Sequence, residues 1–211
     1  MSVGGQLKKR LAEERQSVLM RPSSGKVALI LGGADCVEKD RVAALALFTP
    51  DCVVCINESG RDYPEYFDHW VSMHPNKAPT TVGLEGWVKE RRKLGRPDAG
   101  RLWIPQHRQP PPGLQMMVSR APSWGGSSGL LACVVVVVAL NCRGVLAGCP
   151  MQKDRAHYFD KRIWAEADRY RPSWIRYMPQ IKGRIKSMSG WTQEMLGAPT
   201  AAWLNGESRA A

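Results

Sequence analysis

Two short segments of the chain combine small residues with groups that can hold an anion. Gly32-Gly33-Ala34-Asp35 follows an apolar run, and Ser127-Ser128-Gly129 precedes one. Glycine lets the backbone come close to a ligand, and the first amides of a helix have no intrahelical acceptor. Serine hydroxyls beside such amides favour a phosphate or a carboxylate. The predicted ligand-binding residues are therefore Gly32, Gly33, Asp35, Ser127, Ser128 and Gly129. The alternatives are a tight turn at the first segment and a plain helix cap at the second.

Two further polar residues follow apolar runs. Asn57 comes directly after residues 52–56, and His74 comes directly after residues 68–73. A histidine can act as a general base near neutral pH or bind a phosphate, so His74 is the predicted catalytic residue. A lone histidine before Pro75 is also typical of a turn, which is the alternative. Asn57 is predicted to contact the ligand.

No motif for a metal or for an activated nucleophile stands out. The Ser-His-Asp spacing, HExxH, a Walker lysine and a DxD-type pair are missing from the sequence, so no metal ligands are assigned and the cofactor stays unknown. Cys52 and Cys55 form a CxxC pattern, but residues three apart in a strand point to opposite faces. We expect both to be unpaired, buried core cysteines rather than a metal or redox site.

The charge balance favours an anionic partner. Among 211 residues there are 30 Lys and Arg against 19 Asp and Glu, which gives a net charge of +11. Between residues 153 and 186, basic side chains alternate with Trp and Tyr, a composition that suits nucleic acid or nucleotide stacking. The alternative is an amphipathic helix whose aromatic rings pack on the domain.

Short apolar runs predict the elements that position these residues. They indicate strands at 26–31, 52–56, 68–73, 102–104 and 145–148, and a terminal strand at 183–188. Helices are expected at 37–48 and 84–94, and a long loop at 105–129. The run Leu130–Leu140 holds five consecutive valines, whose propensity favours a strand. Its length and the serines before it favour a buried helix over 129–141, which is our prediction.

The alternation of strands and helices predicts an α/β fold with a mainly parallel, doubly wound, Rossmann-like sheet. We divide the chain into a basic leader at 1–25, the α/β domain at 26–151 and a helical, basic, Trp-rich extension at 152–211. Loops at the carboxyl ends of such strands share one edge, so the predicted residues should bound one pocket, with basic side chains of the C-terminal segment as one wall.

The lengths of the apolar runs also indicate the cellular compartment of the protein. Leu130–Leu140 is too short to span a membrane, and the first residues hold no apolar signal segment. We therefore expect a cytoplasmic protein with reduced thiols and without a membrane span. The oligomeric state is left open.

Four segments resemble one Rossmann-like group of proteins: KVALILGGAD, CVVCINESG, DHWVSMHP and GSSGLLACVVVVVALNCRGVLAGCPM. The group includes archaeal 6-hydroxymethylpterin pyrophosphokinases and the motility-accessory-factor glycosyltransferases of flagellin, and uncharacterised phage and prophage proteins look similar. The resemblance covers about residues 26–151 and is most specific at 127–148. It implies that a nucleotide or a nucleotide-activated sugar lies against the first glycine turn and the Ser/Gly helix start. Carried over residue by residue, it implicates Gly32, Gly33, Asn57, Ser127, Ser128 and Gly129.

The chain departs from that group in two places. The enzymes carry Gly-x-Gly-Pro-Ser after the first strand, where this chain has Gly32-Gly33-Ala34-Asp35-Cys36, and Gly-x-Asp later, where it has Gly148-Cys149-Pro150. We predict a transferase-like protein that binds a nucleotide or nucleotide-activated sugar; if it is active, the expected reaction is glycosyl transfer, with a pyrophosphokinase-like transfer as the other option. The alternatives are a non-catalytic nucleotide- or nucleic-acid-binding phage accessory protein and a phage structural component, because a fold alone does not supply catalysis. A phage-encoded protein would act in the bacterial host cytoplasm.

Overall fold

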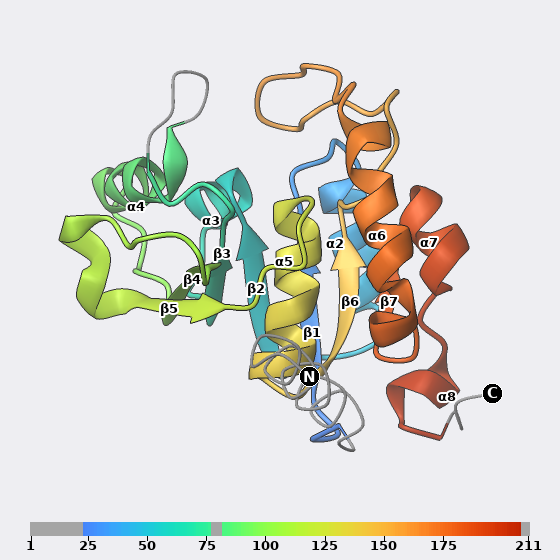
Figure 1. Ribbon diagram of the computed structural model, residues 1–211. Coiled ribbons are helices and arrows are strands. Elements are labelled where there is room, and N and C mark those ends of the chain that lie inside the picture. Colours follow the sequence, from blue (N-terminus) through green and yellow to red (C-terminus); the bar gives the residue numbers. More distant parts are fainter. Residues whose placement is uncertain (1–22, 77–81, 208–211) are drawn as a thin grey trace, which may run out of the picture.

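The computed structural model describes residues 23–76 and 82–207. Most of the predicted leader at 1–25 lies outside the described residues. Within them, one seven-stranded sheet has the order β5-β4-β3-β2-β1-β6-β7 (Figure 1). Every neighbouring pair of strands is parallel. The predicted α/β, doubly wound, Rossmann-like fold is therefore confirmed.

The strands and helices have the following bounds. The strands are β1 (Val27–Leu31), β2 (Cys52–Ile56), β3 (His69–Val71), β4 (Arg101–Pro105), β5 (Val118–Ala121), β6 (Arg143–Ala147) and β7 (Ile185–Ser187). The α-helices are α2 (Val37–Leu45), α3 (Glu58–Asp62), α4 (Gly83–Lys93), α5 (Ser128–Val134), α6 (Ala167–Ile181), α7 (Gly190–Leu196) and α8 (Ala201–Leu204). The described residues also hold two irregular helices, η1 (Pro112–Met117) and η2 (Val135–Ala139).

The strand order reverses at β1. From β1 the chain builds outward through β2, β3, β4 and β5, and it then crosses back to place β6 on the other side of β1. The connections after β1 and after β5 therefore diverge, which leaves a crevice outside the carboxyl ends of β1 and β6. In an open α/β sheet this is the place where a ligand binds.

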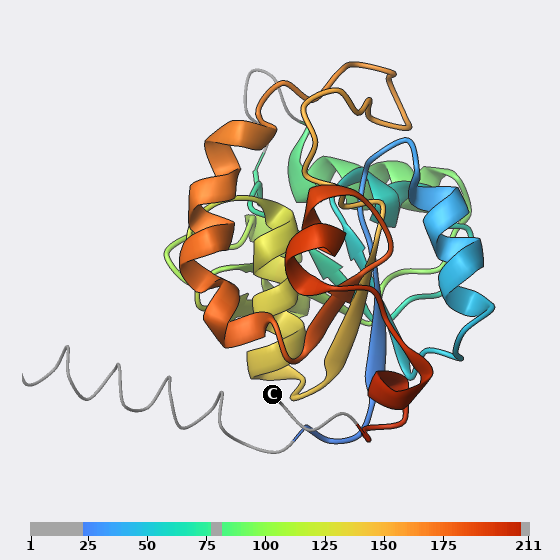
Figure 2. The same cartoon turned by 90° about the vertical axis from the view of Figure 1, so that its right-hand side faces the viewer.

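Helices cover both faces of the sheet (Figure 2). On one face, α5, η2 and α6 pack against Ile30, Val54 and Leu146. On the other face, Leu84 and Trp87 of α4, with Ala44 of α2, pack against alternate residues of the same strands, such as Leu29. Successive residues of a strand point to opposite faces of the sheet. Because both faces are buried, the runs are apolar throughout.

The valine run forms a helix, as predicted. Ser127 caps α5, and the helix continues in π geometry as η2 through Ala139. Residues Leu130 to Val137 are all almost fully buried between the sheet and α6. Packing on every side outweighs the β propensity of valine at this position.

Two features differ from the sequence prediction. Residues 118–121 form β5 within the expected loop at 105–129, and α3 begins where only a turn was expected. The predicted terminal strand at 183–188 is present as β7, which joins the same sheet beside β6, whereas the basic, helical C-terminal extension is not confirmed. The β5 strand escaped prediction because only Ala121 of its four residues is buried, so the segment has no apolar run.

The cysteines of the CxxC pattern lie on opposite faces of β2. Cys52 is half-buried and packs against the core on the α5 face, whereas Cys55 is fully buried on the α4 face. Both thiols are free, as are those of Cys36, Cys133, Cys142 and Cys149. The strand geometry thus explains why the spacing does not bring the two sulfurs together.

Candidate functional site

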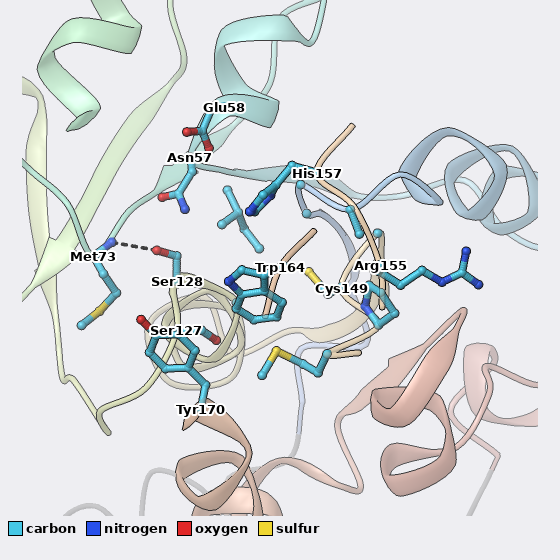
Figure 3. Close-up of a pocket in the computed structure, with 18 of the residues that line it drawn as sticks. Asn57, Glu58, Met73, Ser127, Ser128, Cys149, Arg155, His157, Trp164 and Tyr170 are labelled. Atoms are coloured by element: carbon cyan, nitrogen blue, oxygen red, sulfur yellow. Dashed lines mark hydrogen bonds between the residues drawn. The ribbon is translucent and has the colours of Figure 1, made fainter. Parts of the chain in front are cut away.

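The carboxyl edge of the sheet encloses a cavity of about 380 Å³ (Figure 3). It lies outside the ends of β1, β2, β3 and β6, and the segment between β6 and α6 arches over it (Figure 1). Its lining includes every predicted site residue except Asp35: Gly32, Gly33, Asn57, His74, Ser127, Ser128 and Gly129. The topology brings these residues together because parallel strands end at one edge.

Asp35 lies outside the lining of this cavity. Its carboxylate oxygen is 3.7 Å from a guanidinium nitrogen of Arg155, and its amide donates to the carbonyl of Ala156. The segment around His157 pairs with Ala34 as an isolated antiparallel bridge. This segment covers the glycine turn, so neither Asp35 nor the start of α2 reaches the cavity.

The two glycines of the first turn have different tasks. Neither has a positive φ, so backbone conformation alone does not require glycine. A Cβ on Gly32 would overlap the carbonyl of Gly148 and the sulfur of Cys149, so this glycine lets β1 end close to β6. A Cβ on Gly33 would meet nothing closer than Nδ1 of His157, at 3.8 Å. Gly33 therefore keeps open a space that borders the cavity.

The serines at the start of α5 are both engaged as hydrogen-bond acceptors. The Ser127 hydroxyl oxygen accepts from the amide of Leu130 at 3.4 Å and from Nε1 of Trp174 at 3.1 Å, so Ser127 is a helix cap. The Ser128 oxygen accepts from the amide of Met73 at 3.0 Å, which ties the end of β3 to α5 (Figure 3). Because each oxygen acts as the acceptor in these bonds, each hydroxyl proton can still be donated to a ligand.

His74 lines the cavity. Its backbone is fixed, since its amide donates to the Ser72 hydroxyl at 2.9 Å and its carbonyl accepts from Leu84. Burial, followed by the nearby Arg108 guanidinium, lowers the pKa of the His74 imidazole. The imidazole is therefore neutral at pH 7, which is the form that can accept a proton.

A sharp turn between β2 and α3 presents Asn57 to the cavity. Asn57 has φ 52° and ψ −124°, a conformation that non-glycine residues rarely adopt. Its carbonyl accepts from Nε1 of Trp70 at 2.7 Å and from the amide of Gly60 at 3.1 Å. Beneath the turn, the buried Ser59 hydroxyl accepts a hydrogen bond from the amide of Ile56 and donates one to the carbonyl of Leu31. These contacts hold the strained residue in place.

Glu58 is a lining residue that the sequence prediction missed. It directly follows Asn57, lines the same cavity and is half-buried. Burial raises the pKa of its carboxyl to about 6, against the opposing effects of a hydrogen bond from its own backbone amide and of Arg61. Its position directly after the second strand was visible in the sequence, but its burial was not.

Replacing Glu58 by glutamine should stabilise the folded protein at neutral pH. The pKa of Glu58 is about 6 in the folded state and 4.5 in the unfolded chain, so the folded state binds this proton more tightly. The free energy of unfolding therefore falls as the pH rises through this range and the carboxyl ionises. The groups around it are Arg61, Asp62 and Asp160, and they remain in the variant. We expect the variant to be more stable than wild type by on the order of 1–2 kcal/mol at pH 7.5, with the difference vanishing near pH 4.5.

Urea unfolding at both pH values measures this effect. Glu194→Gln on the exposed side of α7 is the matched control, because it removes a carboxylate that is not buried. A Glu58→Gln advantage that is equal at both pH values would contradict the assignment.

Aromatic rings form the wall opposite the strands. The rings of Trp164 and Tyr170 are stacked with centroids 5.8 Å apart and an interplanar angle of 16°. The His157 ring lies 5.1 Å from that of Phe159 and 6.4 Å from that of Trp164. All of these residues line the cavity, so a flat ligand group would find several ring faces there.

Three arginines line the cavity, and they differ in whether a carboxylate already pairs with them. Arg155 pairs with Asp35, and Arg162 pairs with Asp160 at 2.5 Å. Figure 3 shows the Arg155 guanidinium directed away from Asn57 and Ser128. Arg108 is exposed and forms no ion pair with any described carboxylate. Arg108 is therefore the lining cation most available to a bound anion.

The basic segment at 153–186 packs largely inward. Trp174 of α6 is fully buried, and Tyr177 stacks on Trp124 with ring centroids 5.1 Å apart. Several of its cations also have carboxylate partners, including Lys153 and Arg171, which both pair with Asp168. These contacts favour the amphipathic-helix interpretation over an exposed stacking surface.

No group of three or more His, Cys, Asp or Glu gathers to hold a metal ion within residues 23–76 and 82–207. Over the same ranges, no helix is long and apolar enough to cross a membrane. Comparisons of the chain with protein-family models, with curated proteins and with solved structures gave no match. Function is therefore inferred from the cavity itself.

Proposed function

We propose that the protein binds a nucleotide or a nucleotide-activated sugar in this cavity and transfers a group from it, with glycosyl transfer as the reaction. The observation that carries the proposal is the position of the cavity. It lies at the point where the strand order reverses, and hydroxyl donors, a free cation and stacked rings all face it. Its volume is within the range of small-molecule sites.

The phosphates are assigned to three residues of the cavity lining, Gly33, Ser128 and Arg108. The Ser128 hydroxyl can donate a hydrogen bond, and the first amides of α5 have no intrahelical acceptor. The Gly33 turn allows a close approach of ligand atoms. Arg108 adds a full positive charge, which strengthens a hydrogen bond to an anionic oxygen.

The base is assigned to the wall of stacked rings. Trp164 comes from the segment that leads into α6, Tyr170 comes from the first turns of α6, and His157 and Phe159 come from the loop before them. Stacking of a base on such rings is sequence-tolerant and contributes about 1–3 kcal/mol per base. The rings thus support binding of a nucleotide without selecting one base.

His74 is assigned as the general base. In glycosyl transfer, its neutral imidazole takes the proton of the acceptor hydroxyl while that oxygen bonds to the sugar carbon. The bond from the same carbon to the phosphate oxygen breaks, and Arg108 stabilises the negative charge of the leaving nucleotide. Both residues line the cavity, and Arg108 is close enough to lower the pKa of His74.

A thermal-shift panel tests this proposal. The probes are the adenosine, guanosine, cytidine and uridine diphosphates and their commercially available sugar-linked forms. We expect at least one of them to stabilise the protein by about 2.7 kcal/mol at a concentration 100 times its dissociation constant. A panel without any stabilising compound would overturn the proposal.

The net charge favours a second candidate, a non-catalytic accessory protein that binds nucleic acid. The chain carries +11, and Arg169 and Arg176 of α6 are exposed. This candidate predicts binding of a single-stranded oligonucleotide that weakens steeply with salt. Its weakness is that, on α6, Trp174 is buried and Tyr177 already stacks on Trp124, so neither ring is free to stack on the bases of an oligonucleotide.

A further inference from the structure

We propose that Asn57 and Glu58 form a subsite for the vicinal hydroxyl groups of a sugar, so that the ligand is a ribonucleotide rather than a deoxynucleotide. The inference rests on the proposed nucleotide binding and names which part of the nucleotide lies at the end of β2. Figure 3 shows both side chains on the other side of the cavity from Tyr170.

The first observation is an unsatisfied acceptor. The Oδ1 atom of Asn57 is buried and has no hydrogen-bond partner among the described residues. A buried acceptor without a partner costs free energy, so such atoms are rare unless a ligand completes them. Oδ1 can only accept, and its missing partner is therefore an O–H or N–H group.

The second observation is the backbone that presents this acceptor. Asn57 is held at φ 52° by the hydrogen bond from Trp70 and by the tight packing of Gly60, where a Cβ would overlap the Trp70 indole. Strain that is held in place by its surroundings is typical of functional sites. The fold thus fixes the Asn57 side chain at the cavity.

The third observation is the charge of the next residue. The Glu58 carboxylate lines the cavity and forms no ion pair with any described residue. A carboxylate repels a phosphate, so the anionic end of the ligand must lie elsewhere, toward Ser128 and Arg108. The end of β2 is left for an uncharged part of the ligand that carries hydrogen-bond donors.

A vicinal diol fits this pair of acceptors. Asn57 and Glu58 are consecutive and face one cavity, so neighbouring hydroxyls can donate one hydrogen bond to each. The base has its own place among the rings of Trp164 and Tyr170. In a nucleotide the sugar connects the base to the phosphates, and these two residues therefore face the sugar.

The test compares a ribonucleoside diphosphate with its 2′,3′-dideoxy analogue by calorimetry, using whichever of the ADP, GDP, CDP and UDP pairs binds most tightly. The variants are Asn57→Gly and Glu58→Gln. Glycine is free of strain at φ 52°, so Asn57→Gly removes the amide without straining the turn. Glu194→Gln, which removes an exposed carboxylate on α7, is the control.

We expect wild type and Glu194→Gln to bind the ribonucleotide about 10-fold or more tightly than the dideoxy analogue, because two hydrogen bonds are lost. In Asn57→Gly and Glu58→Gln the preference should fall to about 3-fold or less. Equal binding of both compounds by wild type would overturn this inference while nucleotide binding stands. A preference that survives in both variants would also overturn it. Absence of binding by every compound would overturn the proposed function, and this inference with it.

Discussion

Arg91→Ala should destabilise the protein by about 3–5 kcal/mol, since four backbone carbonyls lose one buried donor group together. The Arg91 side chain is fully buried, although it carries a charge. Its guanidinium donates to the carbonyls of Gly60 at 2.9 Å, Glu65 at 2.6 Å and Pro97 at 2.6 Å, and also to that of Tyr63. Three of these carbonyls belong to α3 and the loop after it, and that of Pro97 belongs to the connection between α4 and β4. Arg91 thus fixes the segment that follows Asn57 and Glu58.

Guanidinium chloride unfolding measures the effect, and Arg92→Ala is the matched control. Arg92 lies on the same helix, is about half exposed and pairs with Asp98 at 2.8 Å. An exposed ion pair contributes about 0.2–1 kcal/mol, so the control should lose no more than that. If both variants lose the same small amount, Arg91 does not organise the β2–α3 turn.

Gly32→Ala should cost about 3 kcal/mol of stability, whereas Gly33→Ala should cost less than about 0.5 kcal/mol. The methyl group at residue 32 would overlap the backbone of Gly148, and the ends of β1 and β6 would have to separate. The methyl group at residue 33 would sit 3.8 Å from His157, which is ordinary contact. Gly32 is therefore needed for the close packing of β1 against β6, whereas Gly33 only leaves space beside the cavity.

Thermal unfolding of the two variants measures this difference. Gly183→Ala is a further control, because a Cβ there has no neighbour within 4 Å. Equal destabilisation at residues 32 and 33 would show that the β1 turn is packed differently from the structure described above.

The fold was predictable where the apolar runs are long and buried on both faces. The five strands and the helix over the valine run follow from run length and from the cap at Ser127, because a fully buried element has an unbroken apolar pattern. β5 was not predictable, because an edge strand with one buried residue has no such pattern. The terminal strand at 183–188 was predictable, and β7 lies there, but its place beside β6 was not, because residue type does not decide which strands are neighbours.

The site was predictable to the extent that topology alone decides it. Gly33, Asn57 and Ser128 meet because they follow or precede elements that end at one edge of the sheet. Asp35 was expected in the cavity lining but lies outside it, where its carboxylate pairs with Arg155. Arg155 belongs to a loop distant in the sequence, and the sequence does not reveal where that loop packs. Glu58 was missed because its burial comes from tertiary packing, which residue type and spacing do not reveal.

The most direct test of the central claim is calorimetric titration of wild type and Gly33→Val with the nucleoside diphosphate that stabilises the protein most. The valine methyl groups would occupy the cavity beside His157, in a position where the Cβ itself meets no close atom. Wild type is predicted to bind one nucleotide per chain, and Gly33→Val, with an unchanged melting temperature, to bind it at least about 10-fold more weakly. Equal affinity in the two proteins would contradict the placement of the nucleotide in this cavity.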